Sequence, residues 1–257
     1  MLGFYVMLGI FGLMFGSFLN VCISRIPAGE SIVSPGSRCP RCKTAIAWYD
    51  NIPVISYLVL GGRCRRCGLG ISALYPAVEV VTALAFLGQG LVIGDDLGLL
   101  ASRLAFTAML IVLFGTDLQT MRLPNVITLP GIVLGLICSF LLPPPPGIVA
   151  SLIGAALGAA LPWAIRWVWY QVKGVEAMGL GDVKMLAMIG AFLGWQQVWV
   201  VLFFASLTGA IVGVSMIAMR GRSFASRLPF GTFLAVAAYA ASLFGVPLVD
   251  WYLGLYR

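Results

Sequence analysis

The chain alternates between long apolar stretches and short polar turns over most of its 257 residues. Apolar stretches of roughly 20 residues are typical of helices that span the hydrocarbon core of a membrane. The pattern predicts eight such helices, at 2–21, 74–93, 98–117, 125–142, 148–170, 181–194, 197–219 and 229–250. The stretch 181–194 is short, so its length alone also fits a re-entrant or interfacial segment. We expect an all-α polytopic membrane protein.

The amino-acid composition agrees with a membrane protein. Hydrophobic residues make up 61% of the chain and charged residues 10%, whereas a soluble domain carries roughly 25% charged residues. The net charge of +7 does not require a nucleic-acid partner, because basic loops beside an anionic membrane leaflet account for it. The expected surroundings are therefore a lipid bilayer.

The positions of Lys and Arg predict the orientation in that bilayer. Seven of the sixteen fall within 25–66, and another group lies between the last two stretches, at Arg220, Arg222 and Arg227. The positive-inside rule assigns both groups to the cytoplasm. The N-terminus then lies outside, and 181–194 has to cross. The first stretch lacks a leading basic region and a small-residue cleavage site, so we expect a retained anchor.

Residues 23–73, between the first two apolar stretches, form a soluble insertion that contains two pairs of cysteines. Cys39 and Cys42 form one C-x-x-C knuckle, and Cys64 and Cys67 form a second after 21 intervening residues. This spacing is typical of a closed tetrahedral site for structural Zn²⁺. Two disulfides or a redox pair are the alternative, which a reducing cytoplasm disfavours. We expect Gly61, Gly62 and Gly68 to supply the tight turns that such knuckles need.

The absence of histidine narrows the possible chemistry. Ser-His triads, Cys-His proteases and His-ligated catalytic metals are excluded, which leaves a Ser-Lys dyad or a carboxylate pair. Lys184 is predicted to anchor the inner end of its helix by snorkelling. The acids Asp117 and Asp182 are better placed, because their predicted helices run in opposite directions and bring both to the inner face.

Two acids at one depth suggest acid–base activation of water. We expect the glycines beside Asp182, Gly179 and Gly181, to permit close backbone approach and unusual dihedral angles.

Taken singly, Asp182 also fits a helix N-cap and Asp117 also fits a solvated helix end. Proton-coupled transport is a further role for such acids. Glu79, about one turn inside its helix, faces either the same cavity or the wet interface.

Several motifs together make the chain resemble the bacterial type IV prepilin peptidases, membrane aspartic proteases of the GxGD class. The matching motifs are 16–21 with 25–27, 48–53 between the cysteine pairs, 71–79, Asp117 with 123–125, 179–184, and Pro229 to Gly231. The family often has proline after that last glycine, where this chain has Thr232.

The resemblance implies an inner-membrane endopeptidase that removes the basic leader of type IV prepilins and pseudopilins after a glycine. Asp117 and Asp182 would be its catalytic pair, supported by Gly179, Gly181, Lys184, Glu79, Pro229 and Gly231. The expected parts are a first transmembrane helix (1–22), a cytoplasmic four-cysteine domain (23–73) and a protease domain (74–257).

Many members of that family also methylate the new N-terminal amine with S-adenosylmethionine. The chain has no glycine-rich dinucleotide fingerprint, so a methyl-donor site would have to come from the cysteine loop and the adjoining helix ends. Gly62 and Arg63, next to the second knuckle, are the candidates. The competing functions are a proton-coupled transporter and a zinc-loop membrane scaffold.

Overall fold

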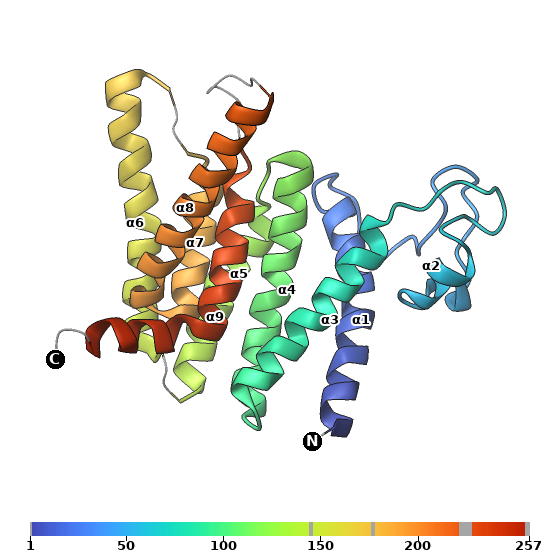
Figure 1. Ribbon diagram of the computed structural model, residues 1–257, viewed down its shortest axis with the longest axis horizontal. Helices are drawn as coiled ribbons and strands as arrows, with labels where there is room; N and C mark the ends of the chain where they lie inside the picture. The colour runs from blue at the N-terminus through green and yellow to red at the C-terminus, as the bar shows by residue number, and fades with distance from the viewer. Residues whose placement is uncertain (1, 144–145, 176–177, 221–227, 255–257) are drawn as a thin grey trace. The chain divides into compact units, whose positions relative to one another are not determined.

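The computed structural model describes residues 2–143, 146–175, 178–220 and 228–254 (Figure 1). Arg222 and Arg227, which entered the orientation argument, lie outside these ranges, and the side chain of Arg220 is not described. The chain divides into two compact units, Met1–Asp95 and Asp96–Arg257. We describe each unit by itself.

All eight predicted stretches are helical. The helices are α1 (Leu2–Arg25), α3 (Leu74–Ile93), α4 (Leu97–Thr120), α5 (Asn125–Leu141), α6 (Ile148–Lys173), α7 (Leu180–Leu193), α8 (Trp195–Arg220) and α9 (Phe230–Gly254). Within the described residues, six are long and apolar enough to cross a membrane: α1, α3, α4, α6, α8 and α9. Because α5 has 17 residues and α7 has 14, the described part of the chain has six candidate spans, and a crossing by α5 and α7 stays a prediction.

Close packing of α1 on α3 builds the first unit. A Cβ atom on Gly12 would lie 2.6 Å from Cα of Ala83, and one on Gly16 would lie 2.7 Å from Cα of Glu79. Glycine lets two helix backbones approach closely where van der Waals contact has to hold them together. Between these helices, the insertion folds into a short 3₁₀ helix, η1 (Trp48–Asn51), a short helix, α2 (Ile55–Val59), and two cysteine knuckles.

The second unit is organised around α7, which packs against α5, α6, α8 and α9. Every α7 residue from Met185 to Leu193 is buried, and a helix that is apolar all round is expected to lie inside a bundle. On the α6 side, Gly154 faces the backbone of Gly190, and Gly158 faces that of Leu186. This central place explains why a 14-residue helix is stable here: its neighbours cover it on all sides from Met185 to Leu193.

Candidate functional site

Asp117 lies in the last turn of α4 and is buried, with 5% of its surface exposed. The helix continues past it to Thr120 and ends where Met121 adopts a left-handed conformation (φ 52°) and donates its N–H to the Asp117 carbonyl. The side-chain Oδ2 atom accepts a hydrogen bond of 2.9 Å from the backbone N–H of Thr232. Asp117 is therefore not the solvated helix end that the sequence left open.

Gly231 is the residue that allows α9 to approach this carboxylate. A Cβ atom at position 231 would lie 2.8 Å from Oδ2 of Asp117 and 3.0 Å from Cδ1 of Leu123, closer than real Cβ contacts. Pro229 contributes to the same turn, because its carbonyl oxygen accepts hydrogen bonds from the N–H (3.3 Å) and the hydroxyl (2.7 Å) of Thr232. The start of α9 thus wraps around Asp117.

Asp182 lies in the first turn of α7 and is half-buried. Its Oδ2 atom accepts the backbone N–H of Gly179, the N-cap residue, at 3.2 Å. The carboxylate therefore caps its helix from the third position rather than as the N-cap residue. The expectation of unusual dihedral angles at the neighbouring glycines is wrong, because Gly179 has φ −72° and Gly181 has no positive φ.

The register of α4 against α7 explains why the two acids lie at the same level. The Phe106 and Phe192 rings, in the first half of α4 and at the end of α7, stack with centroids 4.8 Å apart. Counting away from that contact, Asp117 is eleven residues along α4 and Asp182 is ten residues back along α7. At about 1.5 Å per residue, both lie about 15 to 17 Å from the stacked rings.

Leu123 connects the two acids. It is within 3.0 Å of a Cβ built on Gly231, beside Asp117, and within 2.9 Å of one built on Gly181, beside Asp182. The two carboxylates are also near enough for the charge of Asp117 to act on Asp182. The two acids singled out from the sequence therefore lie near each other, and their catalytic role stays a prediction. Leu123 entered the sequence analysis only as part of the motif 123–125, without this contact role.

Two basic residues fix the segments beside Asp182. Lys184 Nζ donates a 2.8 Å hydrogen bond to Oδ1 of Asn125 at the start of α5, so this side chain links two helices in addition to any role as a membrane anchor. Arg166 of α6 donates from Nη1 to the carbonyl of Met178 at 2.8 Å. One basic side chain therefore holds the turn before Asp182, and another holds the helix just after it.

The four cysteines of the insertion meet in the first unit. Their sulfur atoms all lie within 4.8 Å of one another, and those of Cys39 and Cys67 are 3.6 Å apart. All six cysteines of the chain are free. The arrangement is a four-sulfur cluster that could bind a metal, and the alternative of two disulfides is not observed.

The two knuckles have the same backbone geometry. Lys43 N–H bonds to the Cys39 carbonyl at 2.9 Å, as Gly68 N–H does to that of Cys64. Both donor residues have positive φ, 56° at Lys43 and 68° at Gly68. The turns expected at Gly61, Gly62 and Gly68 are confirmed by positive φ at all three, while Lys43 performs the same turn without glycine.

Polar contacts near the cysteine cluster favour the charged forms of Cys42 and Asp50. Hydrogen bonds from the hydroxyl and the backbone N–H of Thr44 lower the pKa of the Cys42 thiol to about 6. Hydrogen bonds from Arg65 likewise lower the pKa of Asp50. That pair is bidentate, with Nε to Oδ2 at 2.8 Å, and Arg65 also lies over the Tyr49 ring at 5.8 Å. The second knuckle is thereby tied to η1.

Glu79 lies in the first unit and is buried, with 7% of its surface exposed. Its Oε2 atom accepts the backbone N–H of Val54 at 2.8 Å, and its carboxylate also interacts with the Ser17 side chain. Glu79 therefore does not sit at a wet interface. Its described partners belong to α1 and to the loop before α2, and no pattern in the sequence predicted these contacts.

Val54 has an unusual backbone conformation. Its dihedral angles are φ 61° and ψ −50°, and the N–H of Ile55 bonds back to the carbonyl of Pro53 at 2.6 Å. A γ-turn with positive φ is rare and strained, particularly at a β-branched residue. Strain of this kind persists where surrounding contacts enforce it, and it concentrates at functional sites.

Gly62 and Arg63 have local roles in the structure. Gly62 has φ 67°, and a Cβ there would lie 3.0 Å from the Tyr57 hydroxyl. Arg63 is exposed and forms a bridge with Gly70 that closes the second knuckle. These contacts explain both residues structurally, and their assignment to a methyl donor stays a prediction.

Taken together, the helices, the buried acids and the four-sulfur cluster define an all-helical, multi-pass membrane protein with a candidate carboxylate-pair site. Residues 10–92 match the bacterial peptidase A24 N-terminal domain, and residues 104–214 match the type IV leader peptidase family. The chain belongs to this peptidase A24 family of membrane enzymes, which confirms the resemblance drawn from the motifs.

Curated relatives cover nearly the whole chain. A prepilin leader peptidase/N-methyltransferase of Aeromonas salmonicida is 37% identical over 97% of this chain and 94% of its own length. One of Pseudomonas aeruginosa is 36% identical over 94% of this chain and 91% of its own. One of Myxococcus xanthus is 43% identical over 86% of this chain and 65% of its own. No solved structure matches.

Proposed function

We propose that the chain is a prepilin leader peptidase/N-methyltransferase in which Asp117 and Asp182 perform the cleavage. The observation that carries this proposal is the meeting of two acids, 65 residues apart, beside Leu123 in the second unit. The chain's membership of the type IV leader peptidase family and its relatives' names supply the substrate class: prepilins, with pseudopilins as the related substrates of the same chemistry.

The pair suits general acid–base hydrolysis of a peptide bond. One carboxylate in its ionised form accepts a proton from the attacking water, and the other in its protonated form donates to the peptide carbonyl oxygen. Hydrogen bonds from Thr232 N–H to Asp117 and from Gly179 N–H to Asp182 hold one oxygen of each carboxylate in place. Preorganised groups of this kind avoid reorganisation during the reaction.

The proposed orientation brings substrate and site together. With the N-terminus outside and eight crossings of the bacterial inner membrane, α4 ends and α7 begins at the cytoplasmic face. A prepilin's basic leader stays in the cytoplasm while its apolar segment enters the bilayer, so the scissile bond would lie at the level of the acids. In this assignment 1–22 is the first span, 23–73 the cytoplasmic metal domain and 74–257 the protease part.

The four-sulfur cluster suits structural Zn²⁺. With Zn–S bonds of about 2.3 Å, tetrahedral geometry sets the sulfur atoms about 3.8 Å apart, close to the 3.6 Å between Cys39 and Cys67. Cys42 and Cys64 would complete the shell. Four protein ligands leave no open position, so the metal would stabilise the insertion, whose own apolar core is small.

Methylation adds a second reaction. S-adenosylmethionine, when bound, supplies the methyl group for the new N-terminal amine. The sequence-based candidates for holding it are Gly62 and Arg63 beside the second knuckle. No dinucleotide fold is needed, because loop and helix-end groups can form a small-molecule site.

Purified protein incubated with a synthetic prepilin segment and S-adenosylmethionine tests the proposal. Mass spectrometry should find the mature segment plus one methyl group. Asp117→Asn and Asp182→Asn should each abolish cleavage, while Asp250→Asn, an exposed acid of α9, should keep it. Full cleavage by both site variants would refute the assignment. A transporter or scaffold would instead give solute flux or partner capture with no new N-terminus.

A further inference from the structure

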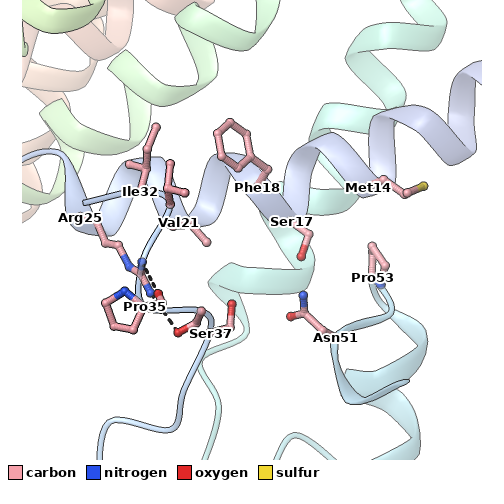
Figure 2. Close-up of a pocket in the computed structure, with 12 residues that line it drawn as sticks. Met14, Ser17, Phe18, Val21, Arg25, Ile32, Pro35, Ser37, Asn51 and Pro53 are labelled. Atoms are coloured by element: carbon pink, nitrogen blue, oxygen red, sulfur yellow. Dashed lines mark hydrogen bonds between the residues drawn. The ribbon is translucent and has the colours of Figure 1, made fainter. Parts of the chain in front are cut away.

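A hollow in the first unit lies between α1 and the loops of the insertion (Figure 2). Its volume is about 340 Å³, and its lining residues come from α1, from 32–37 and from 51–53. Ligand pockets for small molecules begin at about 300 Å³. The hollow is therefore large enough for a small organic molecule, and neither Gly62 nor Arg63 contributes to its lining.

One end of the hollow is cationic. Arg25 extends from the last turn of α1 and donates to the carbonyls of Ser31 (2.9 Å), Pro35 (2.8 Å) and Gly36 (3.4 Å). These bonds hold the loop 31–36 against the helix and take three of the five guanidinium N–H donors. The remaining donors suit a ligand carboxylate.

The opposite end has a buried acid behind its wall. Ser17, Asn51 and Pro53 lie together at this end, away from Arg25 and Pro35 (Figure 2). Behind them, the Glu79 carboxylate interacts with Ser17 and accepts the N–H of Val54. In the described part of the chain, Glu79 has no salt-bridge partner, so its charge favours a cation inside the hollow.

The wall at this end is rigid. The strained turn at Val54 is held by the bond to Glu79. Asn51 ends η1, and its neighbour Asp50 is clamped by Arg65 of the second knuckle. The second cysteine knuckle and the buried acid thus both position residues of one pocket, as preorganised binding sites require.

We propose that this hollow is the pocket for the sulfonium methyl donor S-adenosylmethionine, with Arg25 at its carboxylate and Glu79 drawing its sulfonium toward Ser17 and Asn51. The ligand carries an anionic carboxylate, which matches the cationic end at Arg25, and a cationic sulfonium, which matches the acid behind the opposite end. Phe18, Val21 and Ile32 supply apolar lining for its uncharged parts. Glu79 acts through Ser17 and Val54, so it is a positioning residue.

This assignment rests on the proposed methyltransferase function and replaces Gly62 and Arg63 as the site of the donor. When the donor is bound, the substrate amine nitrogen forms a bond to the methyl carbon as the sulfur–carbon bond breaks. The bonding pair remains on sulfur, and the proton leaves nitrogen for solvent. The product S-adenosylhomocysteine is a neutral thioether. Donor and product therefore differ in the one charge that Glu79 is proposed to attract.

Equilibrium dialysis of the full-length protein in nanodiscs, with S-adenosylmethionine and S-adenosylhomocysteine measured separately, uses this difference. Glu79→Gln keeps the side-chain shape and an acceptor for Val54 N–H. It should weaken donor binding about tenfold by loss of a charge–charge attraction, and product binding about twofold or less. Glu30→Gln, the same change at an exposed acid of this unit, should alter neither.

Asn51→Leu provides a second variant at an exposed position, where misfolding is not expected. It should weaken both ligands alike, because it removes an amide rather than a charge. The pocket assignment is overturned if both variants bind both ligands normally, or if Glu79→Gln weakens both ligands equally. Wild-type protein that neither methylates nor binds the donor would overturn the methyltransferase function itself, together with this pocket.

Discussion

The two compact units hold their reactive groups by different means. In the first, the cysteines, Asp50 and Asn51 lie within 29 residues, 39–67, and short backbone bonds orient them. In the second, Asp117, Asp182 and Gly231 come from three helices far apart in sequence, and packing alone brings them together. A metal ion can compensate for a small core, whereas a carboxylate pair needs a closely packed bundle.

If the units carry separate chemistries, losing one acid should separate the two reactions. Asp182→Asn should lower cleavage about a thousandfold, within the range that general acid–base groups contribute. Methylation of a peptide that already has a free N-terminal phenylalanine should persist. Parallel assays of leader removal and methyl transfer measure this. Loss of both activities in a folded variant would break the separation.

Removing a metal ligand should have the opposite effect: methylation should fall while leader cleavage persists. Cys39→Ser should reduce bound zinc from about one per chain to none, because an incomplete shell binds weakly. Methylation should fall about a hundredfold if the pocket walls lose their support, since misplaced groups carry penalties of that order. Cys138→Ala, outside the cluster, is the control. Metal analysis and both assays measure this. A variant that loses zinc but methylates normally would show that the fold does not depend on zinc.

Close packing at Asp117 predicts a smaller effect from one methyl group. Gly231→Ala sets a Cβ 2.8 Å from Oδ2 of Asp117, and displacement of a reacting group by about 1 Å costs up to about a hundredfold in rate. Gly209→Ala in α8 meets only Phe233, at 3.6 Å, and should cleave normally. Equal rates in the two variants would show that Asp117 tolerates displacement.

The smallest expected effect concerns the N–H that Asp117 accepts. Thr232→Pro removes this donor, together with the hydroxyl that bonds to Pro229, at the start of α9, where a helix tolerates proline. Cleavage should fall about two- to tenfold, the value of one hydrogen bond. Thr232→Val keeps the N–H but loses the hydroxyl bond to Pro229. A larger loss in Thr232→Val than in Thr232→Pro would contradict this account.

Much of this architecture could be predicted from the sequence. The bounds of α3 were predicted to the residue, and those of α7 to within one, because apolar runs between polar turns leave few alternatives in a membrane. The C-x-x-C spacing likewise indicated a sulfur cluster, and the absence of histidine left the acids as candidates. The eight-span topology stays a prediction for α5 and α7.

Other features required the tertiary structure. Hydropathy does not reveal that Thr232 donates to Asp117, that Leu123 lies between Gly181 and Gly231, or that Glu79 holds a strained Val54. Each depends on contacts between segments far apart in the chain, whose geometry is set by side-chain packing rather than by local pattern. The sequence by itself determined the helices, the four cysteines that cluster and the two candidate acids. Packing decided which backbone groups hold those acids and where the first unit is hollow.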